Sequence, residues 1–203
     1  MSFPESQQVD YLQHLKMPIA QDDASAFRTL FNELFPCLSQ FVFSIVKIKE
    51  SSTEIVDEIF IRLWNNRQRI MEIDNLKVYM YRAAKNESLN FISKKAISKV
   101  HEHFDDIVIQ LKDDFSPEHL MINKESLQKI RNVIESLPPQ CKMIFKLVRE
   151  DGLKYKEVAE ILNLSVKTID SQMVIAVSRL REALKSQLNI PVTNKSKKKQ
   201  LFL

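Results

Sequence analysis

Apolar residues recur at intervals of three and four along most of the chain, a period that predicts helices. The first such run follows Asp22 and Asp23, either of which can cap a helix, and Pro36 predicts a kink or a restart within it. The same period predicts helices over about residues 51–65 and 76–95, with a polar segment between them. The first half of the chain therefore predicts a small helical bundle.

Four helices are predicted in the second half, over about residues 123–137, 140–149, 155–162 and 166–188. Two consecutive prolines end the first of them, and the single glycine of the chain closes the turn after the second. Ser165 is a natural N-cap for the last helix, because its hydroxyl can accept from an amide of the first turn. The tight turn between the last two helices predicts a helix-turn-helix.

A helix-turn-helix needs apolar residues that hold the second helix against the first and leave one face free for the major groove of DNA. Such residues occur at the expected spacing: Val158, Ala159, Leu162, Leu164, Val166 and Ile169. Helical periodicity places Ile169, Met173, Ala176 and Leu180 on the inner side of the last helix. The outer side then carries Lys167, Asp170, Ser171, Val174 and Ser178, flanked by Thr168, Gln172 and Ile175.

That outer side has groups suited to reading a duplex. Gln172 can pair bidentately with adenine, and Val174 or Ile175 can touch a thymine methyl group. Phosphates would be held by polar and basic groups of both helices: Lys154, Lys156, Lys167, Thr168, Ser171 and Arg179. An ordinary amphipathic helix pair in a bundle remains the alternative from spacing alone.

Composition and charge favour an all-α protein of two modules. One glycine among 203 residues leaves few positions for tight hairpin turns. The chain carries a net charge of +4, but residues 96–124 hold three basic and six acidic side chains. We therefore predict a flexible N-terminal lead-in (1–21), a first helical domain (22–95), an acidic linker (96–122), a second helical domain (123–188) and a basic, disordered tail (189–203).

Several classes of function are disfavoured. Cys37 and Cys141 match no metal or redox spacing, so we expect buried free thiols in a reducing cytoplasm. His101 and His103 lack a third convincing ligand, and no metal is expected. The sequence shows no nucleophile constellation, phosphate-binding glycine loop, signal peptide or membrane span. We expect a protein that is not an enzyme, with no cofactor and no small-molecule substrate.

Three segments together resemble a known family. Leu153–Leu184 resembles region 4 of the sigma-70 family, Thr53–Arg67 looks like region 2.2, and Asn75–Lys95 is similar to regions 2.3 and 2.4. Their order and the acidic linker resemble the extracytoplasmic-function (ECF) class of sigma factors, over about residues 22–188. Asn90 stands where this family often has an acidic residue, and Asn163 where it often has glycine.

The resemblance implies an alternative sigma factor with two helical domains, which binds core RNA polymerase and directs promoter-specific initiation. Core polymerase would be contacted by Asp57, Glu58, Ile61, Arg62 and Asn65. The minus-10 promoter element would be recognised and melted by Tyr79, Arg82, Lys85, Asn86, Asn90 and Lys94. The minus-35 element would be read by Lys154, Lys156, Ser165, Lys167, Thr168, Asp170, Ser171, Gln172, Val174, Ile175 and Arg179. We also expect Tyr81 to offer a stacking surface beside Tyr79.

The family usually has an inhibitor, often a membrane-spanning anti-sigma factor, so the resemblance implies such a partner as well. Two other functions remain open. The first is a helix-turn-helix regulator that binds an operator as a dimer without being a polymerase subunit. The second is a scaffold that binds only protein.

Overall fold

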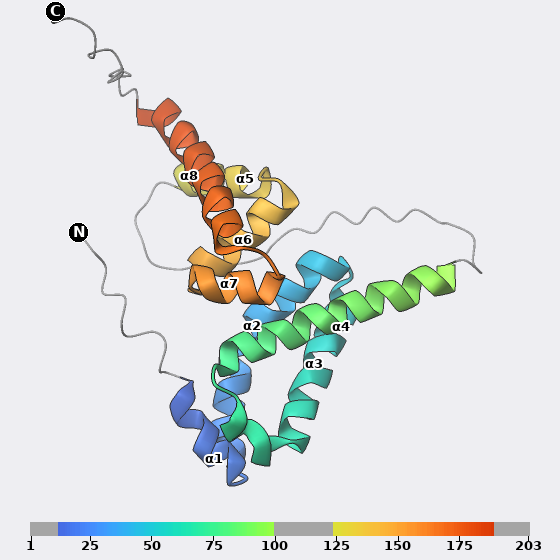
Figure 1. Cartoon of the computed structure of the whole chain (residues 1–203). Coiled ribbons are helices and arrows are strands. Elements are labelled where there is room, and N and C mark those ends of the chain that lie inside the picture. Colours follow the sequence, from blue (N-terminus) through green and yellow to red (C-terminus); the bar gives the residue numbers. More distant parts are fainter. Residues whose placement is uncertain (1–11, 100–123, 189–203) are drawn as a thin grey trace, which may run out of the picture.

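A computed structural model describes residues 12–99 and 124–188 of the chain, and both parts are helical (Figure 1). The tail, His101, His103 and most of the expected linker lie outside these residues. The elements are η1 (Gln13–Leu15), α1 (Lys16–Ala20), α2 (Ala24–Val46), α3 (Lys49–Asn65), η2 (Arg67–Glu72), α4 (Leu76–Lys99), α5 (Lys124–Glu135), α6 (Pro139–Arg149), α7 (Tyr155–Leu162) and α8 (Val166–Leu188). The expected all-α class is confirmed.

Helix α2 is the centre of the first unit, where it packs against α3 and α4. The carboxylate of Asp23 accepts from the amides of Ser25 and Ala26, at 2.8 and 3.1 Å, which satisfies free donors of the first turn. A core stripe with helical spacing runs along α2 through Leu30, Leu34, Leu38 and Val42. The expected restart at Pro36 does not occur, since α2 continues through it to Val46.

Helix α3 contributes the second large set of core residues. Ile55, Val56, Ile59, Phe60 and Leu63 are all buried, as the sequence predicts for the apolar face of this helix. Aromatic rings join α2 to α3, with Phe27, Phe31 and Phe35 of α2 around Phe60 and with Trp64 against Phe27. These contacts fix the apolar face of α3 inward and leave its polar face outward.

The N-terminal lead-in is more ordered than expected. Residues 13–20 form η1 and α1, and Leu15 and Ile19 are buried against the first unit. The Lys16 ammonium donates to the carbonyl of Ile73 at 2.5 Å, although Lys16 is largely buried. The polar segment before α4 is also structured, because Ile70 enters the core and holds η2 in place. Both segments are too short to show a clear period in the sequence.

The second unit is built from α5, α6, α7 and α8. Gly152 has φ of 68°, and Asn163 at the C-cap of α7 has φ of 61° and ψ of 44°, both in the left-handed region. Asparagine tolerates that region better than most residues, which explains why the turn forms without glycine. The hydroxyl of Ser165 accepts from the amide of Thr168 at 3.0 Å, which confirms the predicted N-cap of α8.

By length and composition, α2 is the one helix in the described part of the chain that is apolar enough to cross a membrane. No such segment is predicted from the sequence, in which no run of about 20 apolar residues occurs. The composition of α2 has a structural reason, because this helix serves two neighbours at once. Its core stripe packs against α3 and α4, and further apolar side chains such as Phe31 and Phe35 are half-buried in the aromatic cluster.

Candidate nucleic-acid and protein interfaces

Helices α7 and α8 form the helix-turn-helix. Val158, Ala159 and Ile161 of α7 are buried, as are Ile169, Met173 and Ala176 of α8. The amide of Leu164 donates to the carbonyl of Ala159 at 2.9 Å and closes the turn. The inner side of α8 is therefore the predicted one. Val166 was expected to hold α8 against α7 but is 43% exposed, because it begins α8 on the outward side of the turn.

The outer side of α8 is open to solvent. Val174 is 63% exposed and Ile175 is 42% exposed, so two neighbouring large aliphatic side chains face solvent on this helix. Thr168 and Gln172 are half-buried at the edges of this surface. The other predicted minus-35 residues are all exposed: Lys154, Lys156, Ser165, Lys167, Asp170, Ser171 and Arg179. All of these side chains are thus accessible, from the two helices of one motif.

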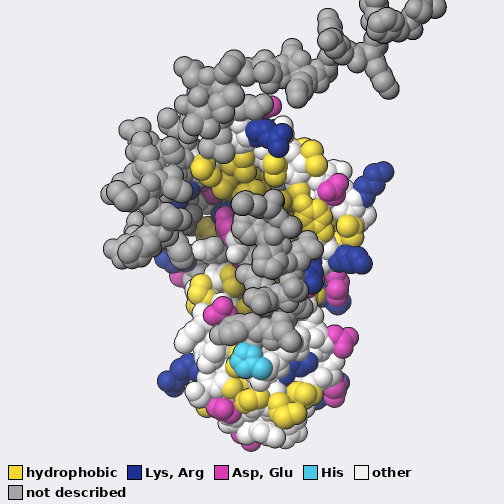
Figure 2. All heavy atoms as spheres, turned by 90° about the vertical axis from the view of Figure 1, so that its left-hand side faces the viewer, with side chains coloured by type: hydrophobic (Ala, Val, Ile, Leu, Met, Phe, Trp, Pro, Cys, Tyr) yellow, Lys and Arg dark blue, Asp and Glu magenta, His cyan; other side chains and the backbone are white. Residues whose placement is uncertain are grey.

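The outer side of α8 is mixed in character, since it carries Lys167, Asp170 and Val174. On the side shown in Figure 2, apolar side chains are interspersed with basic and acidic ones over the upper part of the molecule. No continuous basic surface is visible on that side. Contact with base edges would thus depend on a few polar and aliphatic groups, with phosphate attraction from separate lysines and Arg179.

The polar face of α3 is a second exposed surface. Asp57, Glu58, Ile61, Arg62 and Asn65 are all exposed, and Ile61 reaches 60%. These five predicted polymerase-contacting residues project from one helix whose other face is anchored in the aromatic cluster. This face therefore combines one large aliphatic side chain with charged and polar groups on a firmly packed helix.

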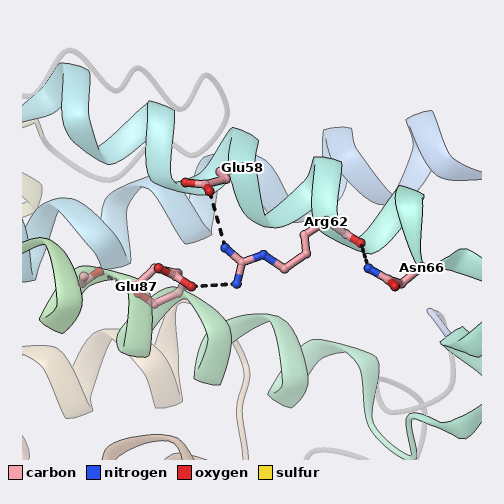
Figure 3. A network of polar contacts seen from close by, with 6 residues as sticks. Glu58, Arg62, Asn66 and Glu87 are labelled. Carbon is pink, nitrogen blue, oxygen red and sulfur yellow. Dashed lines mark hydrogen bonds and ion pairs between the residues drawn. The ribbon is translucent and has the colours of Figure 1, made fainter.

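Arg62 connects this α3 face to α4, as Figure 3 shows. Its Nη1 donates to Glu87 Oε1 at 2.7 Å, and its Nη2 lies 3.7 Å from Glu58 Oε1. The hydrogen bond from Arg62 lowers the pKa of Glu87, and Glu87 in turn raises the pKa of Arg62. The carbonyl of Arg62 also accepts from Asn66 Nδ2 at 2.8 Å at the end of α3. The pair holds the exposed faces of α3 and α4 in a fixed relation.

The predicted minus-10 residues lie along α4. Tyr79 is 43% exposed, and Lys85 is half-buried. Arg82, Asn86, Asn90 and Lys94 are exposed and follow one another along the helix. The expected stacking role of Tyr81 is wrong, because Tyr81 is fully buried and its ring packs 5.2 Å from that of Phe41. Tyr79 is the one exposed aromatic of α4 among residues whose side chains the structure describes.

Helix α7 of the second unit lies against α4 of the first (Figure 1). Arg82 Nη1 donates to Glu160 Oε1 at 2.9 Å, and Asn75 Nδ2 donates to Glu157 Oε1 at 2.9 Å. The ammonium of Lys77 donates to the carbonyl of Asp151. We call these three contacts the α4–α7 contact. Sequence reasoning missed it, since no periodicity or motif relates residues about 80 positions apart.

A small polar cluster lies beside this contact. The hydroxyl of Tyr81 is buried with no hydrogen-bond partner among the described residues, and Asp151 and Cys37 are the polar groups next to it. Burial raises the pKa of Asp151 to about 6 and places the pKa of Tyr81 above its usual range. Asp151 is thus a carboxylate held between two units in a poorly solvated place.

Neither cysteine has the surroundings of a reactive thiol. The Cys141 thiol is buried and donates to the carbonyl of Gln172 at 3.3 Å, as expected for a packed free thiol. Cys37 is half-buried and donates to the carbonyl of Leu34 at 3.1 Å. Burial raises the pKa of both thiols, which lowers their reactivity. No group of three potential metal ligands occurs in the described ranges.

Comparisons with known proteins identify similar chains. The family described as Sigma-70, region 4 matches residues 127–180. The ECF RNA polymerase sigma-E factor of Escherichia coli K12 is 28% identical over 142 residues, which cover 66% of this chain and 72% of that protein. The protein of the same name from Haemophilus influenzae is 23% identical over 182 residues, 84% of this chain and 91% of its own length.

A solved structure is similar in fold. It contains the sigma factor RpoE of Bartonella quintana in complex with the anti-sigma factor NepR. The similarity has a TM-score of 0.54 at 20% identity and covers 78% of this chain and 96% of that chain. The match supports the helical architecture described above.

Proposed function

We infer that the chain is an alternative sigma factor of the ECF class of the sigma-70 family, which binds core RNA polymerase and directs promoter-specific initiation. The observation that supports this most directly is the presence of two separate exposed surfaces, on α3 and on α8, in a chain whose relatives are named as polymerase sigma factors. A dimeric operator-binding regulator is not favoured, because these relatives match most of their own length.

In this proposal the polar face of α3 binds core polymerase. Ile61 would be the buried centre of the interface, surrounded by the charges of Asp57, Glu58 and Arg62 and by Asn65. An exposed aliphatic residue gains most from being covered, whereas the charges around it set orientation and association rate. The Arg62–Glu87 pair would keep this face in register with α4.

Helix α4 would meet the minus-10 element. Strand opening needs a surface for unstacked bases and cations near the single strand. Tyr79 supplies the exposed ring, and the rest of this face consists of Arg82, Lys85, Asn86, Asn90 and Lys94. Because Tyr81 is buried, it would support α4 from inside and would not touch DNA.

Helix α8 would enter the major groove at the minus-35 element. Val174 and Ile175 would contact thymine methyl groups, and Gln172 would pair with adenine from its half-buried position. Lys154, Lys156, Lys167 and Arg179 would hold the flanking phosphates. The isolated protein would bind DNA only weakly, at the non-specific level of about 10⁻⁴–10⁻⁶ M.

The role without catalysis, the location, the two domains and the inhibitor belong to the same proposal. Sigma factors are regulatory subunits, so this chain would confer specificity on polymerase without being an enzyme itself, and it would act in the cytoplasm. Residues 22–95 and 123–188 would be the two functional domains, with the acidic segment 96–122 as linker. An anti-sigma factor would bind it, as the structurally similar sigma factor binds NepR, and that inhibitor would be membrane-spanning in the usual family arrangement.

Run-off transcription tests the proposal. Purified core RNA polymerase would be incubated with genomic promoter fragments, with and without the protein. Discrete transcripts that appear only with the protein are expected, and their shared upstream sequence would identify what α8 reads. The absence of such transcripts, together with failure to co-elute with core enzyme, would contradict the proposal. Promoter binding by the free protein in the nanomolar range would point instead to an operator-binding regulator.

A further inference from the structure

The connection between α3 and α4 is held by side chains from the N-terminal segment. Near its end, Lys16 Nζ donates to the carbonyl of Ile73 at 2.5 Å, and Gln13 Nε2 donates to the carbonyl of Asp74 at 2.8 Å. Lys16 is only 8% exposed, and a lysine is rarely so buried unless its ammonium finds an acceptor. We call Gln13 and Lys16 the N-terminal brace, because together they fix the backbone directly before Asn75.

The other end of the connection is anchored from the same segment. Arg67, the first residue of η2, is paired with the carboxylate of Asp22. Its guanidinium also donates to the carbonyl of Trp64 at 3.0 Å and lies over the indole ring, 4.7 Å from the centroid. Between the two ends, Ile70 is fully buried. The connection is therefore held at its start, at its middle and at its end.

The braced backbone leads directly into the first turn of α4, where Tyr79 lies. Asn75 accepts from two amides of this turn, from Val78 with its side chain and from Tyr79 with its carbonyl, both at 3.0 Å. The hydrogen bond from Gln13 is made to the peptide that joins Asp74 to Asn75. A shift of that peptide would therefore move the capped turn and the exposed ring of Tyr79.

The same connection supplies a cation near this ring. Arg69 of η2 is exposed, and its Nη2 donates to Glu72 Oε2 at 2.9 Å. The pKa of Arg69 is raised mainly by that hydrogen bond and to a smaller extent by Tyr79, so its charge lies within electrostatic range of the ring. An aromatic ring with a cation beside it suits unstacked bases and the backbone of a single strand.

We propose that the N-terminal brace is a positioning element for strand opening, which sets Tyr79 and Arg69 in place for the minus-10 element. Neither brace residue touches DNA in this proposal, since Lys16 is buried and both donors are used on backbone carbonyls. Helix α4 itself would survive loss of the brace, because α2 and α3 pack against it. The proposal rests on the proposed function for the role of α4.

Two variants remove the brace without altering any residue assigned to DNA or polymerase. Lys16→Met keeps an apolar stem and removes the ammonium. Gln13→Ala removes a solvent-exposed hydrogen bond, so it leaves folding intact even if Lys16→Met does not. Lys16→Arg retains a donor, and Gln21→Ala is the matched control, since Gln21 is an exposed glutamine of the same segment outside the brace.

The first readout needs neither DNA nor polymerase. Hydrogen–deuterium exchange of the full chain, followed in peptides that cover residues 74–80, reports on the amides of Val78 and Tyr79. We expect exchange about two- to tenfold faster in Lys16→Met and Gln13→Ala than in wild type, because each variant loses one hydrogen bond. Lys16→Arg and Gln21→Ala should exchange as wild type does. Unchanged exchange in both brace variants would overturn the proposal.

The second readout is capture of a single-stranded oligonucleotide by the holoenzyme, measured by fluorescence anisotropy. The oligonucleotide carries the minus-10 sequence of a promoter that run-off transcription identifies. Both brace variants should weaken capture about three- to tenfold while affinity for core RNA polymerase stays within about twofold of wild type. Unchanged capture would overturn positioning by the brace. A loss of core affinity as large as the loss of capture would also overturn it, since this indicates a general structural defect.

Salt dependence separates positioning from a direct effect of charge. Lys16→Met should keep the wild-type slope of log affinity against log salt, because a buried ammonium releases no counterions from DNA. A slope reduced by about 1 would overturn the proposal, since it would assign a phosphate contact to Lys16. Absence of any polymerase binding by wild type, with the expected exchange result, would instead contradict the proposed function and leave the effect of the brace on α4 intact.

Discussion

The carboxylate of Asp151 gives a pH-dependent test of how the two units pack. Burial is the main cause that raises its pKa from 3.8 to about 6. The groups that face it are Tyr81 and Lys77 of α4, Cys37 of α2, and Glu150 and Lys146 of its own segment. The carboxylate is therefore surrounded mostly by the first unit, and its ionised form is disfavoured by their contact.

The sign of the effect follows from the raised pKa. An acid whose pKa is higher in the folded state stabilises that state in its protonated form. This stability is complete below about pH 4 and is lost as the pH rises to about 6. One pKa unit corresponds to about 1.4 kcal/mol, so the whole loss is about 3 kcal/mol. About half of it, or about 1.4 kcal/mol, falls between pH 5 and pH 7.5.

Asp151→Asn removes the charge and keeps the shape of the side chain. We expect the free energy of unfolding of the variant, minus that of wild type, to be about 1.4 kcal/mol higher at pH 7.5 than at pH 5, because only wild type loses stability over this range. Urea unfolding of the full chain, followed by circular dichroism at pH 5.0, 6.0 and 7.5, would measure this difference. Glu182→Gln is the control, because Glu182 is exposed. A pH-independent difference between Asp151→Asn and wild type would refute the reasoning.

The exposed surfaces give three further predictions. Tyr79→Ala should weaken capture of a single-stranded minus-10 oligonucleotide by the holoenzyme by about 1–3 kcal/mol, whereas Tyr81→Phe should leave capture and thermal stability intact. Ile61→Ser should weaken core-polymerase binding about tenfold without lowering the melting temperature. A lowered melting temperature together with weaker binding would refute a direct contact between Ile61 and polymerase. Val174→Ser should reduce run-off transcription about fivefold on a promoter whose minus-35 element carries thymine, and no reduction would remove Val174 from the reading surface.

Much of the helix-turn-helix could be predicted from sequence because local chemistry determines it. The predicted bounds of α7 and α8 agree with the structure, since Ser165 caps α8 and Asn163 adopts the left-handed turn. Periodicity also placed Ile169 and Met173 inside and Val174 outside. In these helices, spacing and caps leave only one way to bury the apolar residues.

Other features depend on contacts that no local pattern contains. Periodicity could not assign Tyr81, because a tyrosine is compatible with either face and the ring of Phe41 decides the matter. The helices at residues 13–20 exist because Leu15 and Ile19 find a core supplied by distant segments. The pairing of Arg82 with Glu160 requires the two units to meet, and the sequence offers no signal for such an encounter.

Arg82 of α4 and Glu160 of α7 are parts of one chain, and this matters for any ligand that competes with Glu160 for Arg82. The encounter of Glu160 with Arg82 therefore does not weaken when the protein is diluted. Free DNA that binds non-specifically with a dissociation constant of about 10⁻⁴–10⁻⁶ M would rarely displace it at low concentration. A ligand of α4 that uses Arg82 must therefore replace an ion pair that dilution does not weaken.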